Sequence, residues 1–287
     1  MALINKIAVQ AYRTFRRGGG GSEQSFRQNL SILRDLMSRL TAHDVNLDRA
    51  LVLDSAPFDR DTGLAPVTFI DIWKDEHFSM SIFILKPGTR LPMHDHPGMH
   101  GLIRVIHGRM NIFSYSLLQR KRGDSFEPVH TSGYGECYSV RKGDVFMAHQ
   151  LSAASGDTID VNSETIILTP LEGNIHEIRT SDSAVAFFDI LAPPYDDHRY
   201  GPHQCHYYRE LPVSKANTEL SASAQEKNLC KLICIPTPMD YWTDDAPYDG
   251  PYINPNDSRV TVCVCCIAFS AFDTVGWVQE EHMACKN

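Results

Sequence analysis

The feature that most constrains the fold is a long series of short, β-rich segments that begins at residue 67. The segments are 67–73, 78–85, 101–108, 110–118, 135–140, 144–151, 164–170, 184–191, 205–211 and 229–235. Turn sequences separate them, such as KPG at 86–88 and KGD at 142–144. Many short strands at regular spacing are typical of sandwiches and barrels. The sequence therefore predicts an all-β fold for most of the chain.

Two amphipathic helices are predicted before these strands. Residues 3–15 and 23–41 carry apolar residues at helical spacing, and GGGGS at 18–22 is a flexible break between them. The first helix is basic, and its first following acid is Glu23. We favour a helix that packs on the barrel of a cytoplasmic protein, while a mitochondrial address is the alternative. We assign residues 1–44 to this N-terminal segment.

Charge and composition narrow the functional classes. The formal net charge is −8 and there is no broad basic stripe, which argues against a nucleic-acid partner. No apolar run reaches the ~18 residues of a membrane-spanning helix, so no membrane partner is expected. The 8 cysteines fit no disulfide framework, which favours a reducing compartment. We expect a monomer.

Residues 91–108, LPMHDHPGMHGLIRVIHG, contain four histidines. Alternate residues of a strand point to the same face, so His94 and His96 can aim inward while Asp95 points out. Two imidazoles on one strand make half of a metal site, and a ligand from another strand would complete a facial set with open positions. An HxH pair alone is more often a pair of partly exposed polar residues than a metal site.

The surroundings of this pair are more specific. Gly88 lies before His94, and Gly108 lies after His96. This arrangement resembles the first motif of the cupin superfamily, whose members are jelly-roll barrels with a metal at the mouth. The glutamate of that motif is absent, because His100 or Gly101 stands in its place. The resemblance therefore implies a three-histidine site without a carboxylate, as in the thiol dioxygenases of that superfamily.

Four further segments are similar to the cysteamine dioxygenase family, which includes the plant cysteine oxidases. They are HDHPGMHG at 94–101, FFDILAPPYD at 187–196, CHYYRE at 205–210 and PTPMDYW…PYDGP at 236–251. The resemblance extends from about residue 1 to about residue 255. It implies a cupin jelly-roll barrel with short N-terminal helices, and the barrel domain is expected at 45–256.

The family resemblance implies a ligand set for Fe(II). His94 and His96 match the first two ligands, and His176 in ILTPLEGNIHEI matches the third. His149, which ends GDVFMAH, is a rival third ligand that also follows a glycine turn into a strand. His100 follows a Pro-Gly turn and is expected to hydrogen-bond near the site.

Four other residues are implied by the resemblance, each with a structural alternative. Asp189 would hold a substrate ammonium group, or would accept backbone hydrogen bonds at a strand end. Tyr195 would donate a hydrogen bond in the pocket, or would be a loop aromatic. Cys205 and Tyr207 match a pair that some family members join by a thioether; otherwise they are a buried thiol beside a core tyrosine. His107, at a strand end, is expected to be solvated or capping.

The implied reaction is the oxidation of a thiol by O2 to a sulfinic acid. The implied substrates are cysteamine and the N-terminal cysteine of proteins, and the latter would make the protein an oxygen sensor for N-degron degradation. A metal cupin with another substrate and a non-catalytic binding module are the alternatives.

The cysteine-rich extension at 257–287 falls outside the resemblance. An appended tail is favoured over a zinc site for this extension.

Overall fold

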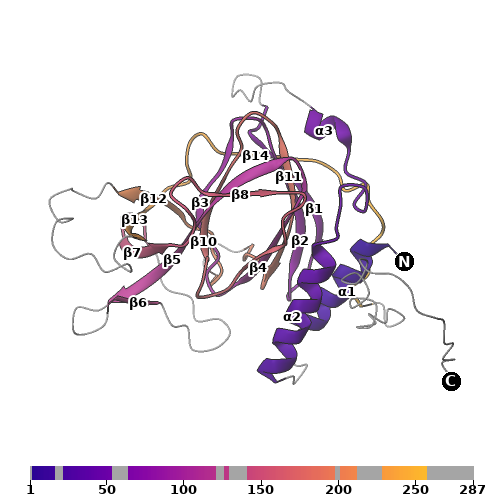
Figure 1. Ribbon diagram of the computed structural model, residues 1–287, viewed down its shortest axis with the longest axis horizontal. Coiled ribbons are helices and arrows are strands. Elements are labelled where there is room, and N and C mark those ends of the chain that lie inside the picture. The colour runs from indigo at the N-terminus through magenta and orange to yellow at the C-terminus, as the bar shows by residue number, and fades with distance from the viewer. Residues whose placement is uncertain are drawn as a thin grey trace, which may run out of the picture.

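The chain folds into a layered β-structure with two helices packed on one side (Figure 1). The computed structural model describes residues 2–16, 22–53, 64–120, 126–128, 141–197, 201–211 and 228–256. The predicted strand at 135–140, most of the glycine-rich linker and the extension at 257–287 lie outside the described residues. The predictions for those segments stay predictions.

The predicted helices are present with small differences in length. They are α1 (Leu3–Phe15) and α2 (Glu23–Met37), followed by a short α3 (Arg49–Leu53) that the periodicity did not indicate. The Ser22 side chain caps α2 by accepting a hydrogen bond from the Ser25 N–H. Helix α2 ends before the predicted residue 41, although Leu40 beyond its end is still buried.

The strands follow the predicted series and add short ones. They are β1 (Val67–Lys74), β2 (Ser79–Leu85), β3 (Arg90–Asp95), β4 (His100–His107), β5 (Arg109–Arg120), β6 (Phe126–Pro128), β7 (Val145–Gln150), β8 (Asp157–Asp160), β9 (Ile166–Leu168), β10 (Ile175–Arg179), β11 (Val185–Ala192), β12 (Tyr207–Leu211), β13 (Leu229–Ile235) and β14 (Thr243–Asp245). The all-β prediction is confirmed.

Two sheets form the barrel. One has the order β14-β1-β2-β11-β4-β9, and the helices cover its outer face. In the other, β10, β3, β12, β13, β7 and β5 pair in succession, and β5 pairs back with β10, so this part closes on itself. Strands β3 and β10 therefore have side chains facing the first sheet on one side and the β12–β13–β7 strands on the other.

Two glycines allow the turns that precede β3 and β5. Gly88, before β3, has a φ of +72°, and Gly108, between β4 and β5, has a φ of +73°. Only glycine adopts such angles without strain. At Gly108 a Cβ atom would also lie 2.3 Å from the Ala184 carbonyl oxygen. The two glycines of the cupin-like motif are thus required by backbone geometry.

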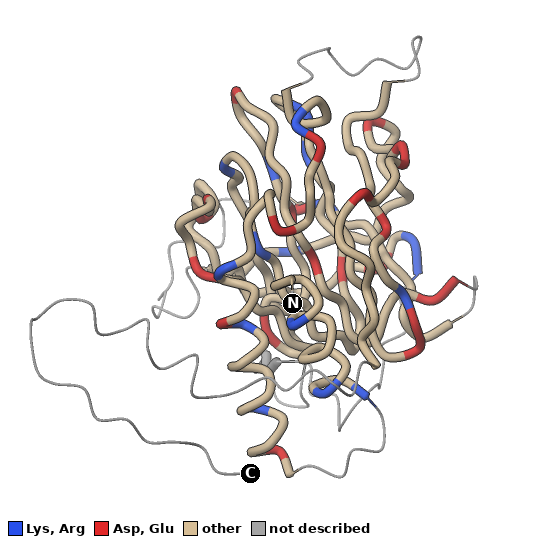
Figure 2. The backbone as a smooth tube through the Cα atoms, turned by 90° about the vertical axis from the view of Figure 1, so that its right-hand side faces the viewer, with Lys and Arg blue, Asp and Glu red and all other residues tan. Residues whose placement is uncertain are grey.

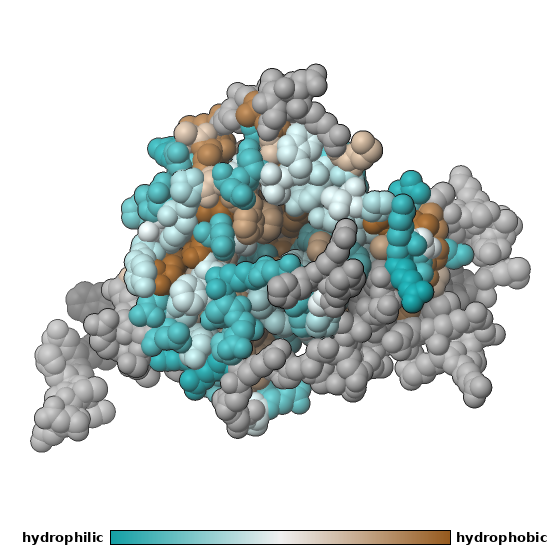
Figure 3. Space-filling view, turned by 180° about the vertical axis from the view of Figure 1, so that it is seen from behind, coloured by the Kyte–Doolittle hydropathy of each residue, from teal (hydrophilic) through white to brown (hydrophobic). Residues whose placement is uncertain are grey.

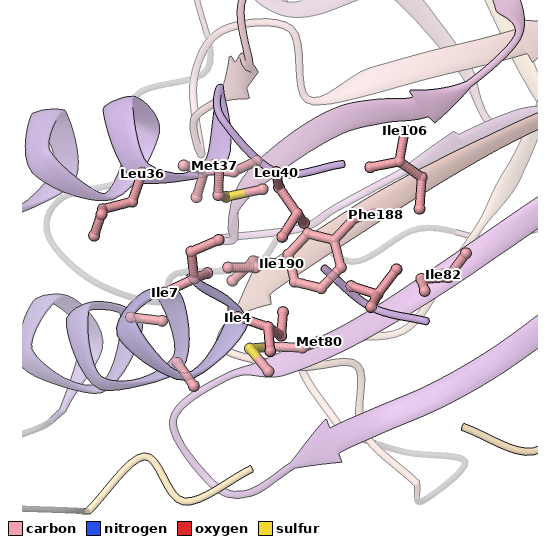
Figure 4. Packing of buried hydrophobic residues seen from close by; sticks show 14 of the residues in the cluster. Ile4, Ile7, Leu36, Met37, Leu40, Met80, Ile82, Ile106, Phe188 and Ile190 are labelled. Carbon is pink, nitrogen blue, oxygen red and sulfur yellow. The ribbon is translucent and has the colours of Figure 1, made fainter. Parts of the chain in front are cut away.

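The helices and the first sheet share one hydrophobic core (Figure 4). Ile4 and Ile7 from α1 meet Met80 from β2 and Phe188 and Ile190 from β11, and all are buried. Helix α1 therefore packs on the barrel, which is the interpretation favoured for residues 3–15. Burying such side chains supplies ~1.5–3 kcal/mol each. The N-terminal helices and the first sheet thus bury apolar side chains against each other.

Charged, polar and apolar residues share the surface of the molecule. Basic and acidic residues are interspersed over the face seen in Figure 2. Figure 3, which views the molecule from behind relative to Figure 1, shows hydrophobic residues exposed between hydrophilic ones. Among the described residues, no helix is long and apolar enough to cross a membrane.

Candidate metal centre

Three buried histidines converge between the two sheets. One ligand nitrogen from each of His94, His96 and His176 lies within 4.8 Å of the others. Their ring centroids are 4.6 to 4.8 Å apart. Among the described residues, this is the group of histidine, cysteine and acidic side chains whose spacing suits a metal ion. No carboxylate belongs to it, as the missing glutamate of the motif indicated.

Strand pairing places the three rings. His176 on β10 lies opposite His94 on β3 in an antiparallel register. His96 follows the end of β3, where its N–H donates to the Asn174 carbonyl and the Asn174 side-chain amide donates to its carbonyl. The backbone of all three histidines is thus fixed by the sheet or by Asn174, and the centre sits on rigid elements.

Hydrogen bonds at Nδ1 leave the other ring nitrogens available to a metal. The Nδ1 atom of His94 lies 2.7 Å from the Pro92 carbonyl oxygen, which can only accept, so Nδ1 carries the proton. The Tyr195 hydroxyl donates to the Asp95 carbonyl and therefore accepts from Nδ1 of His96 at 2.9 Å. Both Nε2 atoms are left with a free lone pair, as metal ligation requires.

Burial keeps the three imidazoles neutral. It lowers the pKa of His94, and it lowers the pKa values of His96 and His176 well below the ordinary 6.5, with the neighbouring histidines adding to the effect. The Nε2 atoms of His96 and His176 are 3.2 Å apart. Two nitrogens at ~2.1 Å from one ion, in adjacent coordination positions, have about this separation. The donor set therefore fits a metal ion held by three neutral ligands.

The other candidate histidines lie elsewhere. His149 is on β7, paired with Ser116 and Leu229, and is not a member of the three-histidine group. The ring of His100 contacts Phe15 and Phe26 of the N-terminal helices, with centroid distances of 6.3 and 5.1 Å. Burial there lowers the pKa of His100 to about 4. His107 is partly buried at the end of β4.

Asp189 lies in the middle of β11, on the face that it shares with Phe187 and Val185. This face points into the barrel, whereas Phe188 and Ile190 point toward the helices. The Asp189 carboxyl is buried, and its Oδ1 atom has no hydrogen-bond partner. A buried acceptor without a partner is costly, so this oxygen is suited to a donor brought by a ligand.

We expect Asp189 to give the metal-free protein a characteristic pH dependence. Burial raises the pKa of its carboxyl from 3.8 to about 7. The folded protein therefore keeps a proton that the unfolded chain releases, and the free energy of unfolding falls as pH rises through this window. The stability of Asp189→Asn relative to wild type should increase by ~2 kcal/mol between about pH 5 and about pH 7.

Denaturant unfolding at several pH values measures that difference. Asp182→Asn, at an exposed position, is the control variant, and its unfolding is measured at the same pH values. A constant offset for Asp189→Asn would contradict the prediction.

Cys205 lies beside the centre and between two tyrosines. Its thiol is in hydrogen-bonding range of the Tyr195 and Tyr207 hydroxyls. Burial raises the pKa of this thiol to about 12. The Tyr207 ring centroid is 6.5 Å from that of His94. The structure thus brings Cys205 and Tyr207 together next to the histidines. Tyr207 is the first residue of β12, and Cys205 lies just before this strand. The thioether stays a prediction.

Sequence reasoning missed several neighbours of the centre. Asp95, expected to point outward, is completely buried on the other side of β3 and binds His206 and Tyr208. Tyr241, from the segment after β13, packs against Tyr207 with ring centroids 6.0 Å apart. Asn174 and Asp95 lie next to predicted ligands in the sequence, which was the one signal available. Tyr241 lies in the PTPMDYW segment that resembles the family, although no role was inferred for it.

A jelly-roll barrel with three buried, neutral histidines and no carboxylate ligand defines a metal-binding protein of the cupin type. The family model described as PCO_ADO matches residues 36–253. The chain therefore belongs to this family, the cysteamine dioxygenases and plant cysteine oxidases that its sequence resembles.

Named relatives agree with this assignment. The chain is 35% identical to 2-aminoethanethiol dioxygenase of Mus musculus over 88% of this chain and 97% of the relative. The Homo sapiens 2-aminoethanethiol dioxygenase gives the same identity and the same coverage. Plant cysteine oxidase 2 of Arabidopsis thaliana is 27% identical over 78% of this chain and 72% of its own length.

Proposed function

We propose that this protein is an iron-dependent thiol dioxygenase. Its substrates would be cysteamine, the N-terminal cysteine of proteins, or both, and its product the sulfinic acid. A thiol and one O2 molecule contain all the atoms of a sulfinic acid, so the reaction needs no external reductant. The names of the relatives and the family membership support the reaction class.

The observation that carries the proposal is the pairing of a carboxylate-free centre with a buried acid that has one unpartnered oxygen. Three neutral imidazoles leave a divalent cation its full positive charge, which favours an anionic ligand such as a thiolate. Asp189 Oδ1, inside the same barrel, lacks a donor. An aminothiol offers one group to each site, a thiolate to the metal and an ammonium to Asp189.

The residues of this chain then have distinct tasks. His94, His96 and His176 would hold Fe(II), which when bound supplies the electrons that activate O2 toward the thiolate sulfur. Tyr195 holds His96 in the tautomer that frees Nε2. Asp189 would bind the substrate ammonium, and the two sheets exclude water around both. No protein nucleophile is required.

Product analysis tests the reaction. The protein is loaded anaerobically with Fe(II) and mixed with cysteamine or with a peptide that begins with cysteine, and masses are measured after O2 is admitted. We expect a gain of two oxygen atoms on sulfur. The same peptide with an acetylated N-terminus and the iron-free protein serve as controls. No oxygenated product from either thiol would refute the proposal.

We expect Asp189→Asn to weaken the binding of amine-bearing thiols. A hydrogen bond between charged groups contributes ~1.5–3 kcal/mol, so KM for cysteamine should rise about tenfold to a hundredfold. 2-Mercaptoethanol carries a hydroxyl in place of the amine and serves as the matched substrate. Its KM should change little in the variant. An equal loss with both thiols would contradict the assigned role of Asp189.

A binding module without catalysis, or a metal cupin with another substrate, is the second candidate. Purified protein that neither contains iron nor takes it up would favour the module. If the N-terminal cysteine of proteins is the substrate, the protein would act as a cytoplasmic oxygen sensor, because O2 would then limit the modification that marks those proteins for degradation.

A further inference from the structure

We propose that Asp95, between the two histidines of the HDH sequence, is a positioning residue that fixes Cys205 and Tyr207 against the three-histidine centre. The inference rests on the proposed function, whose site it completes. It concerns how two segments far apart in the chain, β3 and the residues that lead into β12, are joined.

The Asp95 side chain points away from the metal side of β3. His94 and His96 face the centre, while Asp95 faces the space between β3 and the β12–β13–β7 strands, near Tyr208. Its relative exposure is 0%. A buried carboxylate is retained only when hydrogen bonds compensate for the loss of water. Its partners therefore show what it does.

Those partners are consecutive or nearly consecutive residues of one segment. The His206 N–H donates to Asp95 Oδ1 at 2.8 Å, and Nδ1 of His206 lies 3.1 Å from Oδ2. The Tyr208 hydroxyl donates to Oδ2 at 2.8 Å. In the main chain, the Asp95 N–H donates to the His206 carbonyl at 3.1 Å. Asp95 thus holds His206 by both its backbone and its side chain.

His206 is the residue between Cys205 and Tyr207. Fixing it therefore fixes the two side chains that flank it in the sequence. Tyr207 lies opposite His94 in the strand register, and the Cys205 thiol is in hydrogen-bonding range of the Tyr207 and Tyr195 hydroxyls. The Tyr195 hydroxyl in turn donates to the Asp95 carbonyl. Asp95 therefore connects His94 and His96 to the Cys205 sulfur and to the phenols of Tyr195 and Tyr207.

Removing the carboxylate should loosen this segment. In Asp95→Ala the His206 N–H and the Tyr208 hydroxyl lose the acceptor that the Asp95 carboxylate provides. We therefore expect Cys205 to become at least about tenfold more reactive in the metal-free protein. Asp95→Asn keeps one acceptor oxygen and should give a smaller increase.

The experiment is site-resolved alkylation of the metal-free protein with iodoacetamide, followed by peptide mass spectrometry. Cys230 is the internal control. It is buried in β13, the strand that pairs with β12, and its thiol donates to the Ala148 carbonyl. Glu177→Gln is the matched variant. Glu177 is also a buried carboxylate next to a histidine of the centre, but it binds Arg90 and Arg179.

Faster alkylation of Cys205 relative to Cys230 in the Asp95 variants, with no change in Glu177→Gln, supports the proposal. Equal acceleration in Glu177→Gln, or unchanged rates in both Asp95 variants, overturns it. If Asp95→Ala does not fold, Tyr208→Phe removes the hydroxyl that binds Asp95 and should shift the rate in the same direction. The readout requires neither iron nor O2, so its failure is distinguishable from failure of the proposed reaction.

Discussion

Replacing His176 by alanine is expected to abolish iron retention and to lower turnover by at least ~100-fold. The remaining ligands, His94 and His96, would come from one strand end, and two imidazoles do not make the facial set that holds the ion in place. Iron content after anaerobic loading and desalting measures the first effect. Sulfinic acid formation from cysteamine measures the second.

His149→Ala is the control for this experiment. His149 was the rival third ligand in the sequence, yet it lies on β7 outside the three-histidine group. We expect His149→Ala to retain iron and to form product at nearly the rate of the unaltered protein. Loss of iron from His149→Ala with retention by His176→Ala would reverse the proposed ligand assignment.

Replacing Phe188 by alanine is expected to destabilise the protein by ~3–5 kcal/mol. Phe188 is completely buried in the core shared by the helices and the first sheet (Figure 4). Its removal leaves a cavity between β11 and α1 that rigid strands cannot close. Thermal or denaturant unfolding measures the loss of stability.

Leu53→Ala is the matched surface change, because Leu53 at the end of α3 is 68% exposed. Its effect should stay within ~0.5 kcal/mol. A loss for Phe188→Ala no larger than that for Leu53→Ala would mean that the helices contribute little to the stability of the barrel. The same comparison tests whether the N-terminal segment belongs to the folded unit.

The local periodicities of the sequence were sufficient for most of the secondary structure. The apolar spacing of residues 3–15 predicted α1 with its observed bounds, and the predicted strand at 229–235 is β13. Very short strands such as β14 and β9 were missed or lengthened, because their backbone is held by a neighbouring strand and not by the pattern of their own side chains. Period-two alternation also predicted the shared face of His94 and His96.

Contacts between segments that lie far apart in the sequence could not be predicted from local periodicity. Alternation placed Asp95 on the side of β3 opposite to the two histidines, but the sequence offered no means of finding that Tyr208 and His206 cover that side. The same holds for His100, whose environment comes from Phe15 and Phe26 of the helices. Burial of a polar side chain depends on which segment packs over it, and that is a property of the whole fold.

The sequence by itself determined the all-β architecture, the glycine turns around the HDH pair and the absence of a carboxylate ligand there, because these depend on residue type and short-range spacing. The resemblance to the family favoured His176 over His149 as the third histidine, but only the tertiary structure brings its ring beside the pair. His149 and His176 both follow turns into strands, and pairing of β10 with β3 places His176, and not His149, beside His94. Strand pairing between distant segments creates the centre, and no local pattern specifies it.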